Sequence, residues 1–210
     1  MLKKVLKIIK YLTLLGVLLF IGFYFYVKYY WHNFIDEDII ELFTTEVKLA
    51  DKLPKKFYEL YNVEYNNALL NNFNNYALKE ILYTQYREKP PSAQVARMFI
   101  VFSSKTPSRH RYKLLEISLT WEIEKRTSQQ ECLNWITEKY DFLNQAKGIK
   151  QASKLYFKKT VENLNEKELA QIVIMLKNSS LYNPFRRQKL IDVKVQELLS
   201  KRQKLTTYEH

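Results

Sequence analysis

Lys113 and Glu116 are the pair of residues in this sequence whose types and spacing are best suited to chemistry. They lie in the segment SRHRYKLLEISLTWEIEKR, which begins at Ser108 and repeats its apolar residues at helical spacing. Side chains three residues apart share one face of a helix, so this ammonium and this carboxylate can contact each other or one common ligand. A purely structural ion pair is the alternative interpretation of the same spacing.

The composition limits the class of protein and the kind of partner. The chain has 210 residues, 47% of them apolar and 15% aromatic, which is enough to bury the core of one domain beside an appendage. Its formal net charge of +12 favours anionic partners such as phospholipid head groups, pyrophosphate-linked lipids or nucleic acid. Cys132 is the single cysteine, so an internal disulfide is excluded, and we expect this thiol to be buried between helices.

An uncharged apolar segment near the N-terminus predicts a membrane anchor. It begins at Tyr11 and ends at Val27, at the short end of the roughly 17 to 25 residues that a transmembrane helix needs. A cleaved signal peptide is the alternative, but the run is bulky and no small-residue cleavage site follows it. The lysines that precede the run predict a cytoplasmic N-terminus with the remaining chain outside; they are Lys3, Lys4, Lys7 and Lys10.

Aromatic residues at the end of this segment predict an interfacial belt, formed by Tyr24, Tyr26, Tyr29, Tyr30 and Trp31. If the basic domain faces away from the cytoplasm, nucleic acid is excluded as a partner. We therefore expect an anchor region over residues 1–35, one domain over residues 36–205 and a short tail over residues 206–210.

The domain is expected to be all-α. Gly148 is its one glycine, and its apolar residues recur three and four positions apart instead of alternating. The asparagine-rich residues 66–75 read as one amphipathic helix, and residues 188–204 as a basic amphipathic helix. Two prolines predict that Ser92 caps the helix after them, and residues 128–131, SQQE, predict a capping box.

General motifs of catalysis are absent from the sequence. There is no glycine-rich phosphate loop, no pair of His or Cys at metal-binding spacing and no nucleophile elbow. The basic groups at residues 109–113 and 186–189 are either solvated helix faces or anion-binding surfaces. Composition and general motifs alone leave the function open.

The segment YDFLNQAKGIKQASKLYFKK aligns without gaps on the pattern Tyr-Phe-Gly-x-Gly-x-x-Gly-x-x-x-Ala-Ser-x-x-Tyr-Phe-Gly-Lys through Phe142, Asn144, Gly148, Ala152, Ser153, Tyr156, Phe157 and Lys159. It thus resembles the peptidoglycan glycosyltransferase domain of glycosyltransferase family 51, which has this pattern and occurs in penicillin-binding proteins and monofunctional transglycosylases. The segment LNEKELAQIVIMLKNSSLYNPFRR resembles the family's leucine-rich helix and its Tyr-Asn-Pro turn. The resemblance covers about residues 53–199 and implies a lysozyme-like helical domain.

The resemblance assigns roles to the central pair. Lys113 and Glu116 fall on the Lys and Glu of the family's Arg-Lys-x-x-Glu motif, in which the lysine contacts the pyrophosphate of the lipid-linked donor and the glutamate is the second catalytic carboxylate. The arginine of that motif is replaced by Tyr112, although Arg111 beside it carries the same charge.

A second motif, Gly-Gly-Ser-Thr-x-Thr-Gln-Gln, falls on residues 90–97, PPSAQVAR. Only its serine remains, as Ser92, while Arg97 replaces a glutamine and can still contact an anion. Two prolines replace two glycines, which turns a flexible loop into a stiff helix entry. The expected substrate-binding residues are Ser92, Arg97, Arg111, Lys113 and Arg186.

The first family motif, Glu-Asp-x-x-Phe, shows the largest departure. Its glutamate is taken to be the base that deprotonates the acceptor sugar, and the alignment on Phe57 puts Leu53 at that position. Leucine cannot accept a proton, and general acid–base assistance contributes about 10²- to 10⁴-fold to a rate. Asp51 and Glu59 could replace this base only if the local backbone were shifted.

These observations predict a single-pass protein of the bacterial inner membrane with a family 51-like domain in the periplasm. The expected function is a degenerate transglycosylase that binds lipid II, a glycan strand or proteins of cell-wall synthesis. The alternative is a divergent but active enzyme that polymerises lipid II, and a third possibility is a structural partner without the groove. No cofactor is expected, apart from a divalent metal ion if the protein is active.

Overall fold

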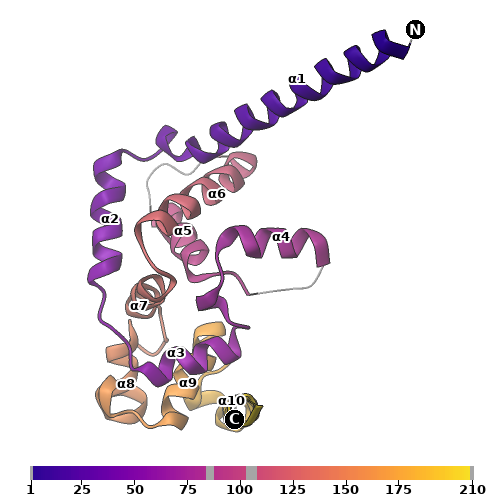
Figure 1. Cartoon of the computed structure of the whole chain (residues 1–210). Coiled ribbons are helices and arrows are strands. Elements are labelled where there is room, and N and C mark those ends of the chain that lie inside the picture. The colour runs from indigo at the N-terminus through magenta and orange to yellow at the C-terminus, as the bar shows by residue number, and fades with distance from the viewer. Residues whose placement is uncertain (1, 84–87, 103–107, 209–210) are drawn as a thin grey trace.

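The computed structural model describes residues 2–83, 88–102 and 108–208, which form an all-helical fold (Figure 1). Within these residues no strand is present, so the prediction of an all-α protein is confirmed. The α-helices are α1 (Leu2–Lys28), α2 (Glu37–Leu49), α3 (Lys55–Glu64), α4 (Phe73–Tyr83), α5 (Pro91–Phe102), α6 (Arg109–Arg126), α7 (Gln129–Lys139), α8 (Ile149–Phe157), α9 (Glu166–Lys177) and α10 (Pro184–Tyr208). Short 3₁₀ turns lie at η1 (Tyr30–Asn33), η2 (Ala68–Leu70) and η3 (Val161–Asn163).

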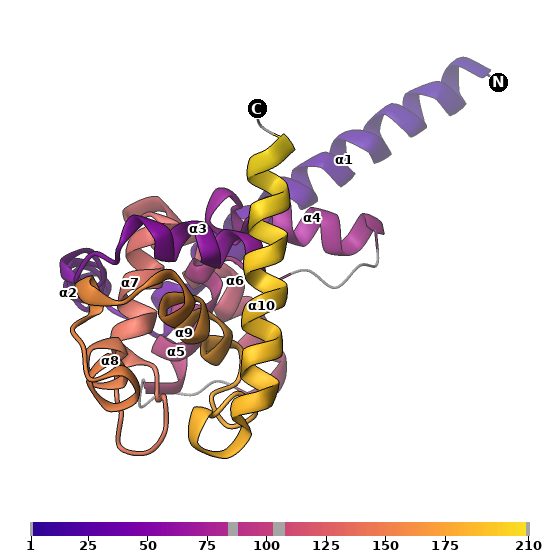
Figure 2. The same cartoon turned by 90° about the horizontal axis from the view of Figure 1, so that it is seen from below.

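Helix α1 extends away from the other helices in both views (Figures 1 and 2). Its segment Lys3–Lys28 is long and apolar enough to cross a membrane, and none of the apolar stretch is buried inside the protein. A helix that exposes leucine and phenylalanine on all sides is suited to lipid. The structure is therefore consistent with a single-pass membrane anchor.

The end of α1 is fixed to α6. The Oγ of Ser118 accepts a hydrogen bond from the backbone N–H of Trp31 at 3.0 Å and donates one to the backbone carbonyl of Lys28 at 3.1 Å. Tyr30 and Trp31 are consequently buried in the protein, and the prediction that they belong to an interfacial aromatic belt is wrong for these two residues. The chain turns at η1, which carries their rings into the core, while Tyr24 and two neighbouring tyrosines stay exposed.

The buried side chains of the domain form two main clusters. One contains Trp31, Leu119 and Trp135 and joins η1, α2, α5, α6 and α7. The other contains Phe57 and Ile172 and joins α3, α8, α9 and α10, with α7 contributing to both. Because side chains from α3, α9 and α10 interdigitate, these helices lie side by side in Figure 2.

The sequence correctly predicted how α7 begins. Ser128 and Glu131 form the predicted capping box of this helix.

Two other predictions about the helices are wrong. Helix α5 begins at Pro91, so Ser92 lies inside the first turn and does not cap it, and residues 66–75 contain η2 and the start of α4 instead of one helix. Asn66 and Asn67 adopt positive φ, which ends α3 before that segment.

The segment that carries the family pattern keeps an unusual backbone. The pattern's glycines fall on Leu143, Gln145, Gly148 and Lys158, and all four positions have positive φ, between 57° and 81°. Such angles favour glycine, because a Cβ atom is crowded in the left-handed region. The fold thus retains the backbone geometry of the pattern at three positions where the sequence has lost its glycine.

Candidate functional site

A cleft lies between the two core clusters. Its larger pocket, of about 580 Å³, is lined from the α3–α9 side by Tyr61, Tyr65, Leu176 and Lys177, and from the other side by Tyr76, Glu88, Lys89, Gln94, Arg97 and Met98. A smaller pocket of about 240 Å³ adjoins it and is lined by Phe73, Tyr76, Ala77, Lys89, Lys113, Glu116 and Ile117. Tyr76 and Lys89 line both pockets, so the two share a wall, and together they are called the cleft below.

Glu116 is the centre of a charge cluster in this cleft. Its Oε1 accepts from the Lys89 Nζ and from an Arg97 guanidinium nitrogen, each at 3.1 Å, and its Oε2 lies 3.5 Å from the Lys113 Nζ. The carboxylate is only 3% exposed, whereas the three cationic side chains are between 32% and 70% exposed. Three accessible cations therefore converge on one buried carboxylate.

Electrostatics keep this carboxylate charged. Burial alone would raise the pKa of Glu116, but Lys89, Arg97 and Lys113 outweigh it and hold the pKa below its ordinary value of 4.5. Tyr112 lies beside the cluster. Its partial burial and the negative charge of Glu116 raise the pKa of the Tyr112 hydroxyl, which therefore stays neutral.

The sequence of α6 explains the position of Glu116. Leu115, Leu119 and Ile123 follow one another at a spacing of four and face the core. Glu116 lies next to this stripe, at the edge where α6 meets the cleft, and Ser118 on the same helix holds the end of α1. One helix thus connects the membrane anchor to the charged cleft.

Lys89 is a site residue that the sequence reasoning missed. It precedes Pro90 and Pro91, in a segment that resembled the family only through its serine. Lys89 and Glu116 are 27 positions apart, so their contact depends on how α5 packs against α6, which helical spacing does not predict. The one sequence feature that pointed to Lys89 was its position directly before two prolines, because a proline restricts the backbone of the residue before it.

The other predicted binding residues lie elsewhere. Ser92 is buried, and its hydroxyl donates to Glu124 at 2.8 Å while its N–H donates to Gln129 at 2.9 Å. Arg111 and Arg186 are exposed and belong to the lining of neither pocket. The structure therefore brings together Arg97, Lys113 and Glu116 from the predicted set, and ligand contact by any of the six residues stays a prediction.

The residues at the expected position of the base are also outside the cleft. Leu53 is 7% exposed and packs in the core cluster that contains Phe57 and Ile172. Asp51 forms an ion pair with Lys150, and Glu59 forms one with Arg202 at 2.6 Å. Neither carboxylate lines either pocket, so neither occupies the place of the missing base in this conformation.

A second carboxylate does line the cleft. Glu88 lies in the larger pocket, next to Lys89 in sequence, and its Oε1 is 3.7 Å from the Lys177 Nζ. Lys177 also pairs with Glu64 at 2.7 Å and lies over the Tyr65 ring, 5.2 Å from its centroid. The shorter contact with Glu64 leaves Glu88 the more weakly held of the two carboxylates.

The charges around Glu116 do not favour a divalent cation beside it. In the described ranges, no three His, Cys, Asp or Glu side chains are grouped as a metal site requires. Glu116 is surrounded by cations, which makes it a poor ligand for a divalent ion.

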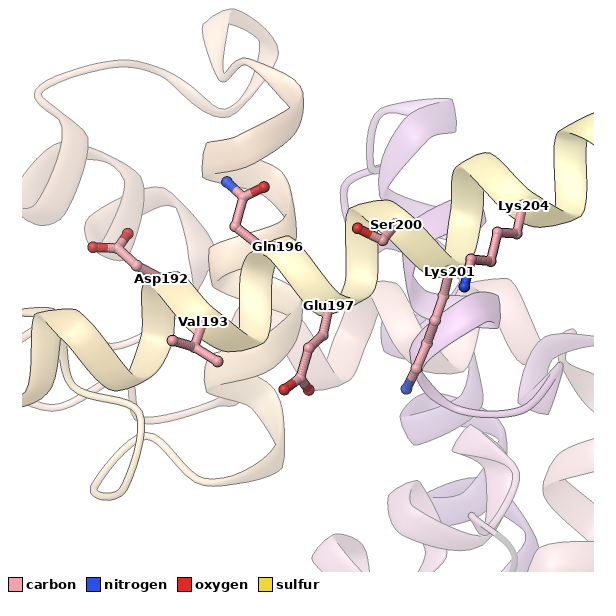
Figure 3. Close-up of a pocket in the computed structure, with 7 residues that line it drawn as sticks. All are labelled: Asp192, Val193, Gln196, Glu197, Ser200, Lys201 and Lys204. Atoms are coloured by element: carbon pink, nitrogen blue, oxygen red, sulfur yellow. The ribbon is translucent and has the colours of Figure 1, made fainter.

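A further hollow, of about 640 Å³, lies along α10 (Figure 3). All seven residues that line it belong to this one helix (Figure 3). A surface with a single wall does not enclose a ligand. The cleft at Glu116, which is bounded by several helices, is the better candidate site.

Comparison with known proteins identifies the family of this chain. The sequence model of the transglycosylase family matches residues 92–205, which include α6 and the segment with the family pattern. Penicillin-binding protein 1A of Pseudomonas aeruginosa is 33% identical over 91 residues, which are 43% of this chain and 11% of that relative. The chain thus matches about a tenth of the length of this relative. Because the family model matches more than half of the chain, this protein belongs to the transglycosylase family and has its lysozyme-like, all-helical fold.

Proposed function

We propose that this protein is a membrane-anchored, catalytically degenerate transglycosylase that binds a lipid-linked cell-wall precursor such as lipid II. The observation that carries the proposal is the convergence of Lys89, Arg97 and Lys113 on Glu116 in the cleft, combined with a buried leucine at the position of the family's base. A glycan strand and proteins of cell-wall synthesis are further binding partners under this proposal.

The charge of the cluster suits a pyrophosphate. Three cations and one carboxylate leave a net charge of +2, and a pyrophosphate diester carries one negative charge on each of its two phosphates. Charge-assisted hydrogen bonds from Lys and Arg to phosphate are about twice as strong as neutral ones. The exposed faces of the three cations can make such bonds without first breaking up the core.

The position of the cleft relative to α1 suits a lipid-linked ligand. Ser118, which holds the end of α1, lies two residues from Glu116 on α6. A helix rises about 1.5 Å per residue and measures about 10–12 Å across, so the cluster lies within roughly one helix diameter of the anchor's end. In lipid II the pyrophosphate is attached directly to the lipid and lies at the same level, near the membrane surface.

The same reasoning supports a location in the inner membrane with the domain in the periplasm. The four lysines before the apolar stretch favour a cytoplasmic N-terminus. The basic cleft would then face the compartment in which lipid-linked precursors are consumed, and nucleic acid would be out of reach.

A binding and polymerisation assay on the full chain in lipid nanodiscs tests this proposal. We expect the protein to bind lipid II and to leave it unpolymerised, and we expect Lys113→Ala to weaken binding about tenfold, or about 1.4 kcal/mol. Lys154→Ala is the matched control, because Lys154 is an exposed lysine of α8 outside both pockets and its loss changes the net charge equally. Equal binding by both variants, or polymerisation at the rate of an authentic transglycosylase, would contradict the proposal.

A divergent but active glycosyltransferase is the second candidate, and the position of Glu88 favours it. In this reaction Glu88 would take the proton of the acceptor hydroxyl, whose oxygen forms a bond to the anomeric carbon. The bond from that carbon to the pyrophosphate would break, and the three cations would neutralise the released pyrophosphate.

The same assay separates the two candidates. If the protein is active, Glu88→Gln should reduce polymerisation at least about 10²-fold, because the amide cannot accept the proton. Glu64→Gln is the matched control, since Glu64 is the other partner of Lys177 and lines neither pocket. An active protein whose rate is unchanged by Glu88→Gln would exclude Glu88 as the base.

A further inference from the structure

One cation of the family's Arg-Lys-x-x-Glu motif is missing from α6. The arginine of Arg-Lys-x-x-Glu is replaced by Tyr112, which lies four residues before Glu116 and thus on the same face of the helix. The Tyr112 ring packs against the core cluster that contains Trp31 and Leu119, and its hydroxyl interacts electrostatically with Glu116 and Arg97. A neutral phenol therefore occupies the place from which a guanidinium would reach the cluster.

Lys89 supplies a positive charge at the same carboxylate from another element. Its Nζ donates to the Glu116 Oε1 at 3.1 Å, and Arg97 donates to that same oxygen. An ammonium group has three N–H donors, and Glu116 accepts one of them. Lys89 also lines both pockets, so its side chain is accessible to a ligand in either one.

The chain that follows Lys89 is held in place. Pro90 and Pro91 replace the two glycines of the family motif and restrict the backbone of the residue before them. Ser92 is tied at its N–H to Gln129 and at its hydroxyl to Glu124. The same Glu124 oxygen accepts a hydrogen bond from the Phe73 N–H at 2.9 Å, at the start of α4. Because Phe73 lines the smaller pocket, Glu124 connects Ser92 to a wall of that pocket.

We propose that Lys89 is a pyrophosphate ligand that replaces the arginine lost at Tyr112, and that it makes the cleft prefer a pyrophosphate-linked lipid to a phosphate-linked one. This inference rests on the proposed function. It explains two departures from the family pattern together. The positive charge lost from α6 at Tyr112 is supplied by Lys89 in the segment before α5, and the two prolines that replace glycines hold that segment. Without Lys89 the cluster charge falls from +2 to +1, which matches a single phosphodiester.

The test compares two ligands in nanodiscs that contain the full chain. One ligand is lipid II, and the other is a polyprenyl phosphate sugar with a single phosphate. We expect Lys89→Ala to weaken binding of lipid II about tenfold, to affect the single-phosphate ligand much less, and so to remove most of the preference between them. In Lys89→Ala/Tyr112→Arg, the guanidinium on α6 should restore most of that preference.

The variants also distinguish the ways in which the inference can fail. If Lys113→Ala weakens lipid II binding but Lys89→Ala does not, or if Tyr112→Arg restores nothing, the role of Lys89 is wrong while the proposed function stands. If neither lysine variant weakens binding, the proposed function is wrong and this inference falls with it. Lys89→Gln keeps the length and polarity of the side chain, and serves in place of Lys89→Ala if the alanine variant does not fold.

Discussion

Leu53→Glu is expected to destabilise the protein without creating a transglycosylase. It returns a glutamate to the family's base position, but the Leu53 side chain lies in the core cluster around Phe57 and not in the cleft. A carboxylate without partners in an apolar core should lower the free energy of unfolding by about 2–4 kcal/mol. In a domain of this size that corresponds to a fall in Tm of roughly 5–15 °C, measured by thermal denaturation in detergent.

The backbone prevents the new carboxylate from moving into the cleft. The Leu53 N–H donates to the Tyr58 hydroxyl oxygen at 3.0 Å, and that hydroxyl donates to Asn134 at 2.8 Å. Leu53→Met is the control and should cost less than about 1.5 kcal/mol, because it nearly conserves volume and polarity. The destabilisation by glutamate should shrink at acidic pH, where the buried carboxyl is protonated. A Leu53→Glu protein that melts like Leu53→Met and polymerises lipid II would show that position 53 does reach the cleft.

Gly148→Ala is expected to lower the free energy of unfolding by at least as much as Leu53→Glu. Gly148 has φ +81°, and a Cβ atom added there would lie 2.5 Å from the Glu138 carbonyl oxygen. Both the strained dihedral angle and the clash with backbone act against alanine, so we expect a loss of about 3–5 kcal/mol in the free energy of unfolding. Thermal denaturation should show a fall in Tm of roughly 6–20 °C.

The surroundings of Gly148 leave little room for relaxation. Its N–H donates to the Tyr140 carbonyl at 2.8 Å, and the Glu138 side chain accepts from the Asp51 N–H at 2.8 Å. Gly22→Ala is the matched control, because a Cβ atom there meets nothing within 4 Å and alanine favours a helix. If both variants melted together, the close approach between Gly148 and Glu138 would not exist in solution.

Features that depend on neighbouring residues could be predicted from the sequence. The apolar helix near the N-terminus, the helical domain and the capping box at Ser128 follow from hydrophobic spacing and local hydrogen bonds, which act within about one or two turns. The pairing of Lys113 with Glu116 was predicted for the same reason. The transglycosylase family was also recognisable from residues 141–159 and the Tyr-Asn-Pro turn, and it is confirmed.

The composition of the site was decided by tertiary structure. The contacts of Lys89 and Arg97 with Glu116 join residues 27 and 19 positions apart, and such contacts depend on how α5 packs against α6. Packing also determines that the Ser92 hydroxyl contacts Glu124, that Leu53 lies in the core and that Glu88 lines the cleft. The sequence alone determined Lys113 and Glu116 as a pair on one helix face, because helical spacing is local. Only the tertiary structure made them part of a three-cation cluster, because the other two cations come from elements that helix packing brings together.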